Sequence, residues 1–99
     1  MTRDPFQQLV KYSETAVFSE TTVPKKLLNR HNTKPGIWGK LVVRSGALDF
    51  VLEGPPLKAR RIEAGDYAII EPATDHHVSL VGPATFQVEF YREISGGKR

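Results

Sequence analysis

Short apolar segments separated by turn residues constrain the fold of this chain more than any other feature. Seven prolines and eight glycines punctuate segments rich in valine, isoleucine, phenylalanine and tyrosine. Strands spaced at about 8–12 residues are typical of a sandwich or barrel rather than of alternating strands and helices. The middle of the chain has no amphipathic helical stretch that would cover a parallel sheet. The sequence therefore predicts an all-β fold.

The predicted strands cover residues 16–18, 26–30, 38–44, 47–52, 58–63, 67–71, 77–81 and 86–92. Ser45-Gly46 and Gly82-Pro83 are predicted turns between strands, since both pairs carry residues that favour tight turns. The first dozen residues are predicted to form a short helix or arm, with Phe6, Leu9 and Val10 on one side.

The length of 99 residues predicts a single domain over 1–99, with its core at about 16–92. The absence of cysteine excludes disulfides and thiolate metal sites. No run approaches the roughly 18 apolar residues of a membrane helix, and the N-terminal segment has no apolar core of a secretory signal. We therefore expect a cytoplasmic protein that does not bind membranes.

A net charge of +3 raises the possibility of a nucleic-acid partner. The basic residues are scattered along the chain, however, and no aromatic RNA-binding motif or helix-turn-helix pattern accompanies them. The charges therefore predict a solvated surface rather than a nucleic-acid interface.

The three histidines lie beside turns in two separated segments. His31 precedes Pro35-Gly36, while His76 and His77 follow the Pro72 turn. Successive residues of a strand point to opposite faces, so at most one of His76 and His77 is predicted to face the interior. Because closure of a barrel brings the ends of distant strands together, we expect His31 and His76 to approach each other at one mouth.

The order of features resembles that of the cupin superfamily. The resemblance lies in segment 41–50, in segment 63–72 with its Gly65-Asp66 pair, and in His76 after Pro72. A finer resemblance is to the TehB/YeaR-like family, carried by segment 31–34, Gly36, segment 38–41 and Glu71-Pro72. It implies a small cupin-like β-barrel, a role associated with stress or tellurite resistance, and a homodimer.

Two departures from the family pattern limit what is carried over. The positions where cupins place their first metal ligands fall near Lys34, Gly36 and Gly39, none of which is a ligand. TehB proteins continue into a methyltransferase, whereas no glycine-rich cofactor loop follows a strand here. The methylation chemistry is therefore not predicted.

A divalent metal is one interpretation of the histidines. Neutral imidazole suits zinc, nickel or iron, and the predicted ligands are His31, His76 and Glu89, with Glu71 and then His77 as alternatives to Glu89. Zinc sites use three protein ligands plus water, or four. The competing interpretation is that His31 and His76 are hydrogen-bonded pocket residues without a metal.

A second predicted set would line a ligand pocket. It comprises Trp38, Lys40, Tyr67 and Tyr91 together with the two histidines. Lys40 or Lys34 would attract an anion. Large aromatic side chains also serve as core residues, so Trp38, Tyr67 and Tyr91 keep that alternative.

Three functions follow from these expectations. The first is a binding or sensing module for a metal, a small molecule or an anion. The second is a metal-dependent enzyme of the dioxygenase or isomerase type, in which two histidines and one carboxylate hold iron. The third is an interaction domain whose main act is dimerisation through edge strands.

Overall fold

The structure is a computed structural model that describes residues 9–93. In chain order its elements are β1 Leu9–Glu14, β2 Phe18–Ser19, the 3-10 helix η2 Lys25–Leu28, β3 Ile37–Leu52, β4 Lys58–Glu63, β5 Tyr67–Ile70 and β6 His76–Glu93. The strands form one six-stranded antiparallel sheet. This confirms the all-β prediction. Among the described residues, no helix is long and apolar enough to cross a membrane.

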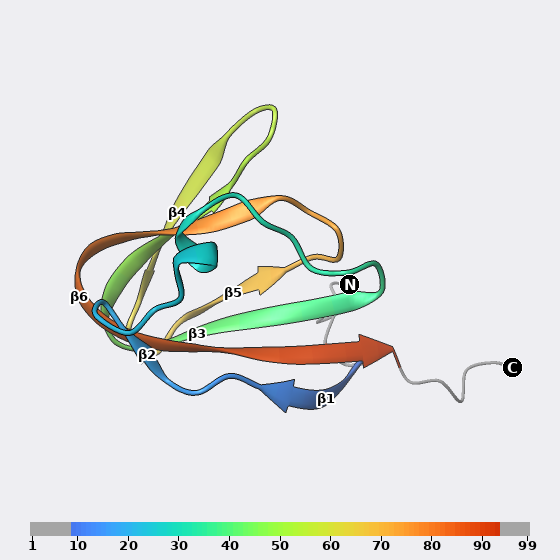
Figure 1. Cartoon of the computed structure of the whole chain (residues 1–99), viewed down its shortest axis with the longest axis horizontal. Helices are drawn as coiled ribbons and strands as arrows, with labels where there is room; N and C mark the ends of the chain where they lie inside the picture. The colour runs from blue at the N-terminus through green and yellow to red at the C-terminus, as the bar shows by residue number, and fades with distance from the viewer. Residues whose placement is uncertain (1–8, 94–99) are drawn as a thin grey trace, which may run out of the picture.

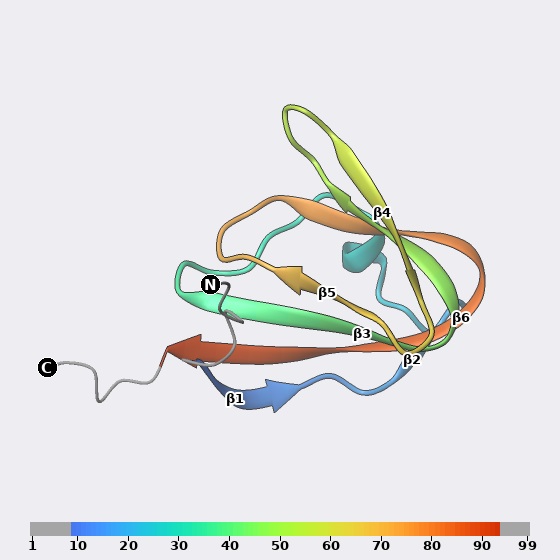
Figure 2. The same ribbon diagram turned by 180° about the vertical axis from the view of Figure 1, so that it is seen from behind.

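Two long strands organise the sheet. β3 and β6 pair antiparallel from Ile37↔Arg92 to Leu52↔His76, and both bend back at one end of the molecule, on the left of Figure 1. β5 pairs with the first half of β3, and β4 pairs with the second half. β1 and β2 pair with the C-terminal half of β6, as the view from behind shows (Figure 2). The bend therefore folds one sheet over itself.

Gly46 lies at the bend in β3. The register between β3 and β6 shifts on both sides of it, between Val43 and Ser45 and again between Gly46 and Leu48. Gly46 has φ +71°, and a Cβ there would collide with the carbonyl oxygen of Pro83. Such bulges bend a strand without ending it. The predicted turns at Ser45-Gly46 and Gly82-Pro83 are therefore wrong, because the backbone pairing resumes beyond each.

The core lies between the two folded halves of the sheet. Alternate residues of β3 and β6 point inward, as the two-residue period of a strand requires. Phe86 and Leu48 are fully buried, and Phe18 packs edge-on against Phe86 with ring centroids 6.0 Å apart. The core cluster comprises Leu41, Val43, Leu48, Phe50, Ile62, Ala68, Ile70, Val78, Phe86 and Val88.

Several predicted boundaries agree with the structure, and others do not. Residues 58–63 form β4 as predicted, and β5 ends one residue earlier than predicted. Residues 26–30 are not a strand, because η2 turns there, with Leu27 N donating to the carbonyl of Pro24 at 3.0 Å. Residues 9–14 are a strand rather than a helix, since the long edge of β6 supplies backbone partners. Phe6 lies outside the described residues.

The described strands do not close into a barrel. The hydrogen-bonded path runs β1-β6-β3-β4, and no pairing joins β1 to β4 within residues 9–93. Closure into a cupin-like barrel therefore stays a prediction.

Candidate functional site: a histidine pair at a cavity

His31 and His76 form an isolated antiparallel bridge at the start of β6. The amide of His31 donates to the carbonyl of His76 at 3.0 Å, and the amide of His76 donates to the carbonyl of His31 at 2.8 Å. Their imidazole rings meet edge to face, with centroids 4.2 Å apart and an interplanar angle of 64°. The structure thus brings together two residues that are far apart in the sequence.

Each ring is held by a backbone carbonyl two residues earlier. Nδ1 of His31 lies 2.8 Å from the carbonyl oxygen of Asn29, and Nδ1 of His76 lies 2.7 Å from that of Thr74. A carbonyl oxygen only accepts hydrogen bonds, so each Nδ1 carries a hydrogen, and in a neutral imidazole of this kind the lone pair is on Nε2. Metal-binding histidines commonly have this arrangement, because the outer hydrogen bond fixes the tautomer and the ring orientation.

A carboxylate clamp joins the two histidine segments. Asp75 accepts hydrogen bonds from Arg30 Nε and from Asn32 Nδ2, both at 2.8 Å. Arg30 and Asn32 flank His31, while Asp75 precedes His76. These hydrogen bonds, with Asn32 contributing most and Arg30 next, lower the pKa of Asp75. The clamp therefore joins the segment that carries His31 to the segment that carries His76.

Burial determines the charge of His76. Only 2% of this residue is exposed, and its ring lies 5.4 Å from the ring of Phe50. Desolvation lowers the pKa of His76, because burial disfavours the charged imidazolium. His76 is consequently neutral at pH 7, which is the form that binds metals.

The histidine pair lines a cavity of about 540 Å³. This volume lies within the range of pockets that take small molecules. The walls come from β1, β2, η2, β3, β5 and β6 and from the loop after η2. They comprise Tyr12, Ser13, Thr15, Phe18, Pro24, Lys26, Leu27, His31, Asn32, Thr33, Lys34, Ile37, Ile70, His76, Val88 and Phe90.

Glu89, the predicted third metal ligand, is not brought to the histidine pair. Val88 and Phe90 line the cavity, so Glu89 between them points to the opposite face of β6. There it accepts a hydrogen bond from Tyr91 Oη at 2.8 Å and lies 3.6 Å from Lys11 Nζ. The same face carries Trp38 and Lys40, which are the β3 partners of Tyr91 and Glu89. These side chains lie apart from the cavity.

The two alternative third ligands also lie apart from the pair. His77 is hydrogen-bonded through Nδ1 to the Glu53 carboxylate. Glu71 is exposed, and its backbone carbonyl accepts a hydrogen bond from Thr33 Oγ1 at 3.4 Å. Within residues 9–93, no group of three histidine, cysteine, aspartate or glutamate residues is placed to hold a metal ion. The described residues therefore offer a metal ion only two imidazole nitrogens here, one from His31 and one from His76. Any further ligands would have to come from outside the chain.

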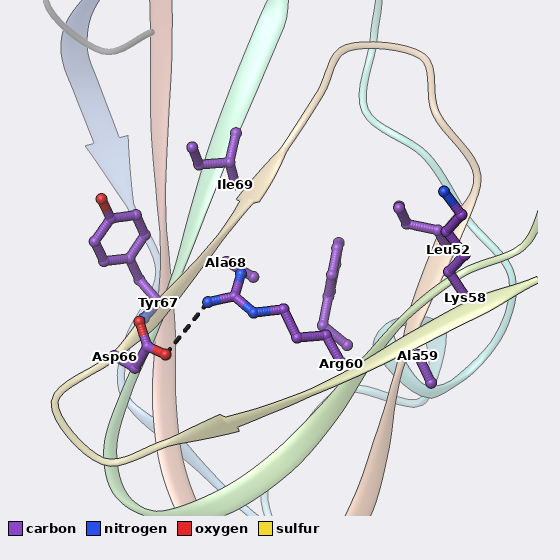
Figure 3. A pocket seen from close by; sticks show the side chains of 9 residues that line it. Leu52, Lys58, Ala59, Arg60, Asp66, Tyr67, Ala68 and Ile69 are labelled. Atoms are coloured by element: carbon purple, nitrogen blue, oxygen red, sulfur yellow. Dashed lines mark hydrogen bonds and ion pairs between the residues drawn. The ribbon is translucent and has the colours of Figure 1, made fainter. Parts of the chain in front are cut away.

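Tyr67 lines a second cavity, of about 580 Å³, between β4 and β5. Figure 3 shows the Arg60 side chain extending toward Asp66, with Tyr67 beside them, and the ion pair joins Arg60 Nη2 to Asp66 Oδ2 at 3.3 Å. Lys40 Nζ lies 4.4 Å from the centre of the Tyr67 ring. No histidine lines this cavity. The predicted ligand residues therefore divide between separate surfaces.

Sequence reasoning missed the residues that support the histidine pair. Asp75, Arg30 and Asn32 lie next to the histidines in sequence, and this adjacency was the available indication. The sequence offered no indication that the backbone carbonyls of Asn29 and Thr74 hold the two rings, because every residue carries a carbonyl group.

Comparisons with known proteins agree with this architecture. The chain is 33% identical over 78 residues to the probable S-adenosyl-L-methionine-dependent methyltransferase TehB of Haemophilus influenzae, covering 75% of this chain and 27% of that protein. It is 26% identical over 94 residues to the protein YeaR of Escherichia coli K12, covering 86% of this chain and 79% of YeaR. The chain thus spans about a quarter of the TehB methyltransferase that it matches.

Solved structures show the same fold. A crystal structure of an Escherichia coli K12 protein superposes with a TM-score of 0.84 at 23% identity, covering 96% of this chain and 100% of that one. The crystal structure of TehB from Haemophilus influenzae gives a TM-score of 0.80 at 25% identity, covering 87% of this chain and 32% of that one. The family model of the TehB-like domain matches residues 13–88. Because that match covers most of the sequence, the chain belongs to the TehB-like domain family.

Proposed function

We propose that this chain is a binding module that holds a small ligand in the cavity at His31 and His76, with a divalent metal ion anchored by the two imidazoles. The pair of Nδ1–carbonyl hydrogen bonds supports this proposal, because it leaves an Nε2 lone pair on each ring. Zinc, nickel and iron accept imidazole nitrogen. A metal held there would supply a Lewis-acid charge that attracts an anionic ligand.

Binding is a better match to the residues present than catalysis is. An iron oxygenase needs two histidines and a carboxylate on one metal, whereas Glu89 lies on the other face of β6 and Asp75 is engaged by Arg30 and Asn32. The described part of the cavity contains no acidic side chain. We therefore extend neither an oxygenase reaction nor the methyl transfer of the longer TehB relative to this chain.

The broader role rests on the family. We propose a sensing function in stress or tellurite resistance, a cytoplasmic location and a homodimer. We also propose that the folded-over sheet is an open version of a small cupin-like barrel. Light scattering would test the homodimer directly, and a monomer at every concentration would refute it.

Metal titration tests the proposed function. Isothermal titration calorimetry with zinc, nickel and, without oxygen, ferrous iron is expected to show one site per chain. His31→Ala and His76→Ala are each expected to abolish binding, because one imidazole is left. His77→Gln is the matched control, since His77 neighbours His76 but pairs with Glu53 outside the cavity. Unchanged metal affinity in both alanine variants would refute the site.

A further inference from the structure

We propose that the gap between β4 and β5 is a docking site for an extended acidic segment of a partner protein, which joins the sheet as a further strand beside β4. This inference goes beyond the proposed function, because no histidine lines the second cavity, which occupies this gap. Three features of the gap carry it: the unpaired strand edges, the residues that border the cavity and the sign of the charges on β4.

β4 and β5 each have a free backbone edge. Within residues 9–93 both strands pair with β3 alone, although they follow one another in the chain. Beyond the turn that joins them, β4 rises away from β5 (Figure 1). Alternate residues of an antiparallel strand direct their N–H and C=O groups to opposite sides, so about half of these groups point away from β3. Such an edge is a template for another strand.

β4 offers the better edge of the two. It has six residues, whereas β5 has four. The amide of Tyr67 in β5 already donates to Oδ1 of Asp66 at 2.7 Å. The main chain of the partner therefore pairs with β4, and β5 forms the opposite wall of the gap.

The second cavity runs along these edges rather than against one face of either strand. Residues 58–60 of β4 and 67–69 of β5 line it, together with Phe50 and Leu52 of β3. Successive residues of a strand point to opposite faces, so a cavity that meets three in a row reaches the backbone between them. A ligand that matches such a border carries donors and acceptors in alternation, as an extended peptide does.

The charges on β4 favour an acidic segment. Lys58, Arg60 and Ile62 alternate along β4 and so share one face, on which Ile62 is buried in the core while the two cations are exposed. A strand added at this edge would place its own side chains of that face directly beside Lys58 and Arg60. Opposite charges in such cross-strand pairs are stabilising, and like charges are destabilising.

Arg60 can accept a carboxylate from the partner at little cost. Its guanidinium pairs with Asp66 at 3.3 Å, and the two side chains are 60% and 51% exposed. Figure 3 shows Arg60 extending from β4 toward Asp66, at the start of β5. Exposed ion pairs contribute little to stability. A carboxylate of the partner can therefore replace Asp66, which meanwhile keeps Arg60 extended toward β5.

The same charges disfavour a second copy of this chain as the occupant. β4 carries three cations, Lys58, Arg60 and Arg61, against the single carboxylate of Glu63. Two such edges brought together repel overall. Residues 94–99 contain Lys98 and Arg99 and no acidic residue, so the C-terminal segment also lacks charge complementarity to β4. The edge therefore selects a segment of opposite charge from another protein.

Amide hydrogen exchange of the full chain with a designed peptide tests this inference. The probe is acetyl-Thr-Glu-Val-Glu-Val-Thr-amide, whose glutamates share one face of a strand and whose valines favour β structure. Binding should slow exchange of the β4 amides, because a new ladder forms there. β1 is the internal control, since it is the strand at the other end of the sheet, and its exchange should not change.

Three matched probes separate the contributions to affinity, measured by calorimetry. A peptide with lysine in place of both glutamates should bind about tenfold more weakly, because attraction to two cations becomes repulsion. A peptide N-methylated at its valines and glutamates keeps the charges but lacks the backbone donors, and it should also bind about tenfold more weakly. A thymidine hexanucleotide tests whether any extended anion suffices.

Variants of the chain locate the charged contacts. Lys58→Gln with Arg60→Gln should weaken binding of the glutamate peptide about fivefold. Lys26→Gln with Lys34→Gln is the matched control, because these exposed cations line the histidine cavity instead. Melting temperatures check that each variant is folded.

Asp66→Asn should strengthen binding of the glutamate peptide about twofold. The substitution keeps an oxygen that accepts from the amide of Tyr67, but it removes the charge that pairs with Arg60. Weaker binding in this variant would contradict the exchange of Asp66 for a carboxylate of the partner.

Each outcome has one meaning. Protection of β1 instead of β4, or no protection, overturns the docking site. Equal affinity for the N-methylated peptide overturns strand addition, and equal affinity for the lysine peptide overturns the acidic partner. A hexanucleotide that binds as tightly as the glutamate peptide and displaces it overturns the assignment to a peptide. Exchange in β4 that slows with protein concentration in the absence of peptide assigns the edge to a second copy of the chain and overturns the inference.

Discussion

His31 and His76 exchange both of their backbone hydrogen bonds, so a loop residue before β3 is paired with the first residue of β6. This pairing fixes the backbones, the outer carbonyls fix the rings, and the Asp75 clamp fixes the two segments relative to each other. Ligand sites require such support because small misplacements of the donor atoms weaken binding. The following expectations test that arrangement.

The pH dependence of stability should reveal the buried His76. Its pKa is lowered from 6.5 by desolvation, so the unfolded chain binds more protons than the folded one as pH falls. The stabilisation is complete above about pH 6.5 and is lost as pH falls through the lowered pKa. Urea unfolding from pH 8 to pH 5 measures the loss, and His76→Gln should flatten the curve there. A wild-type curve that is already flat in this range would contradict the burial of a neutral imidazole.

Asp75→Asn should weaken zinc binding about tenfold, the lower end of the effects of outer residues on metal sites. The substitution keeps the size of the side chain but removes the charge that holds Arg30. Competition with a chromogenic chelator measures the affinity.

Asp49→Asn is the control for that measurement. It removes another carboxylate–arginine pair, with Arg61 at 2.5 Å, between β3 and β4. Zinc affinity should not change in this variant. An equal loss in both variants would show that general destabilisation, rather than the clamp, is responsible.

Glu89→Gln should leave zinc affinity unchanged, because Glu89 lies on the face of β6 opposite the cavity. The same calorimetric titration measures it, with His76→Ala as the variant that loses binding. Loss of zinc binding in Glu89→Gln would restore Glu89 as the third ligand.

Gly46→Ala should destabilise the fold by more than about 2 kcal/mol, since a side chain at positive φ costs about 1–2 kcal/mol before any collision. Gly46 has φ +71°, and its Cβ would strike the Pro83 carbonyl. Gly36→Ala is the matched control, because Gly36 has φ +83° with no atom within 4 Å of the added Cβ. Chemical denaturation should therefore show a smaller loss for Gly36→Ala. Equal losses would mean that the bend tolerates a Cβ.

The sequence by itself determined the β class and the faces of the strands. The turn residues and apolar alternation predicted segments such as 58–63, because side-chain period and turn chemistry are local properties. The same local information predicted that His76 and His77 face opposite ways, and the structure has His76 buried at the cavity and His77 paired with Glu53.

The tertiary structure decided where strands bend, which segments find a strand partner and which side chains meet. Ser45-Gly46 resembles a turn in sequence, but the ladder with β6 resumes beyond it and makes one bent strand. Residues 26–30, predicted as a strand, have no strand partner, and their first part belongs to the 3-10 helix η2. The pairing of β3 with β6 decided which face Glu89 takes, and Glu89 faces away from the histidines. The approach of the two histidine segments brought Asp75, the neighbour of His76, within hydrogen-bond distance of Arg30 and Asn32. A single position along a strand reverses the face, and only the pairing of strands fixes that position.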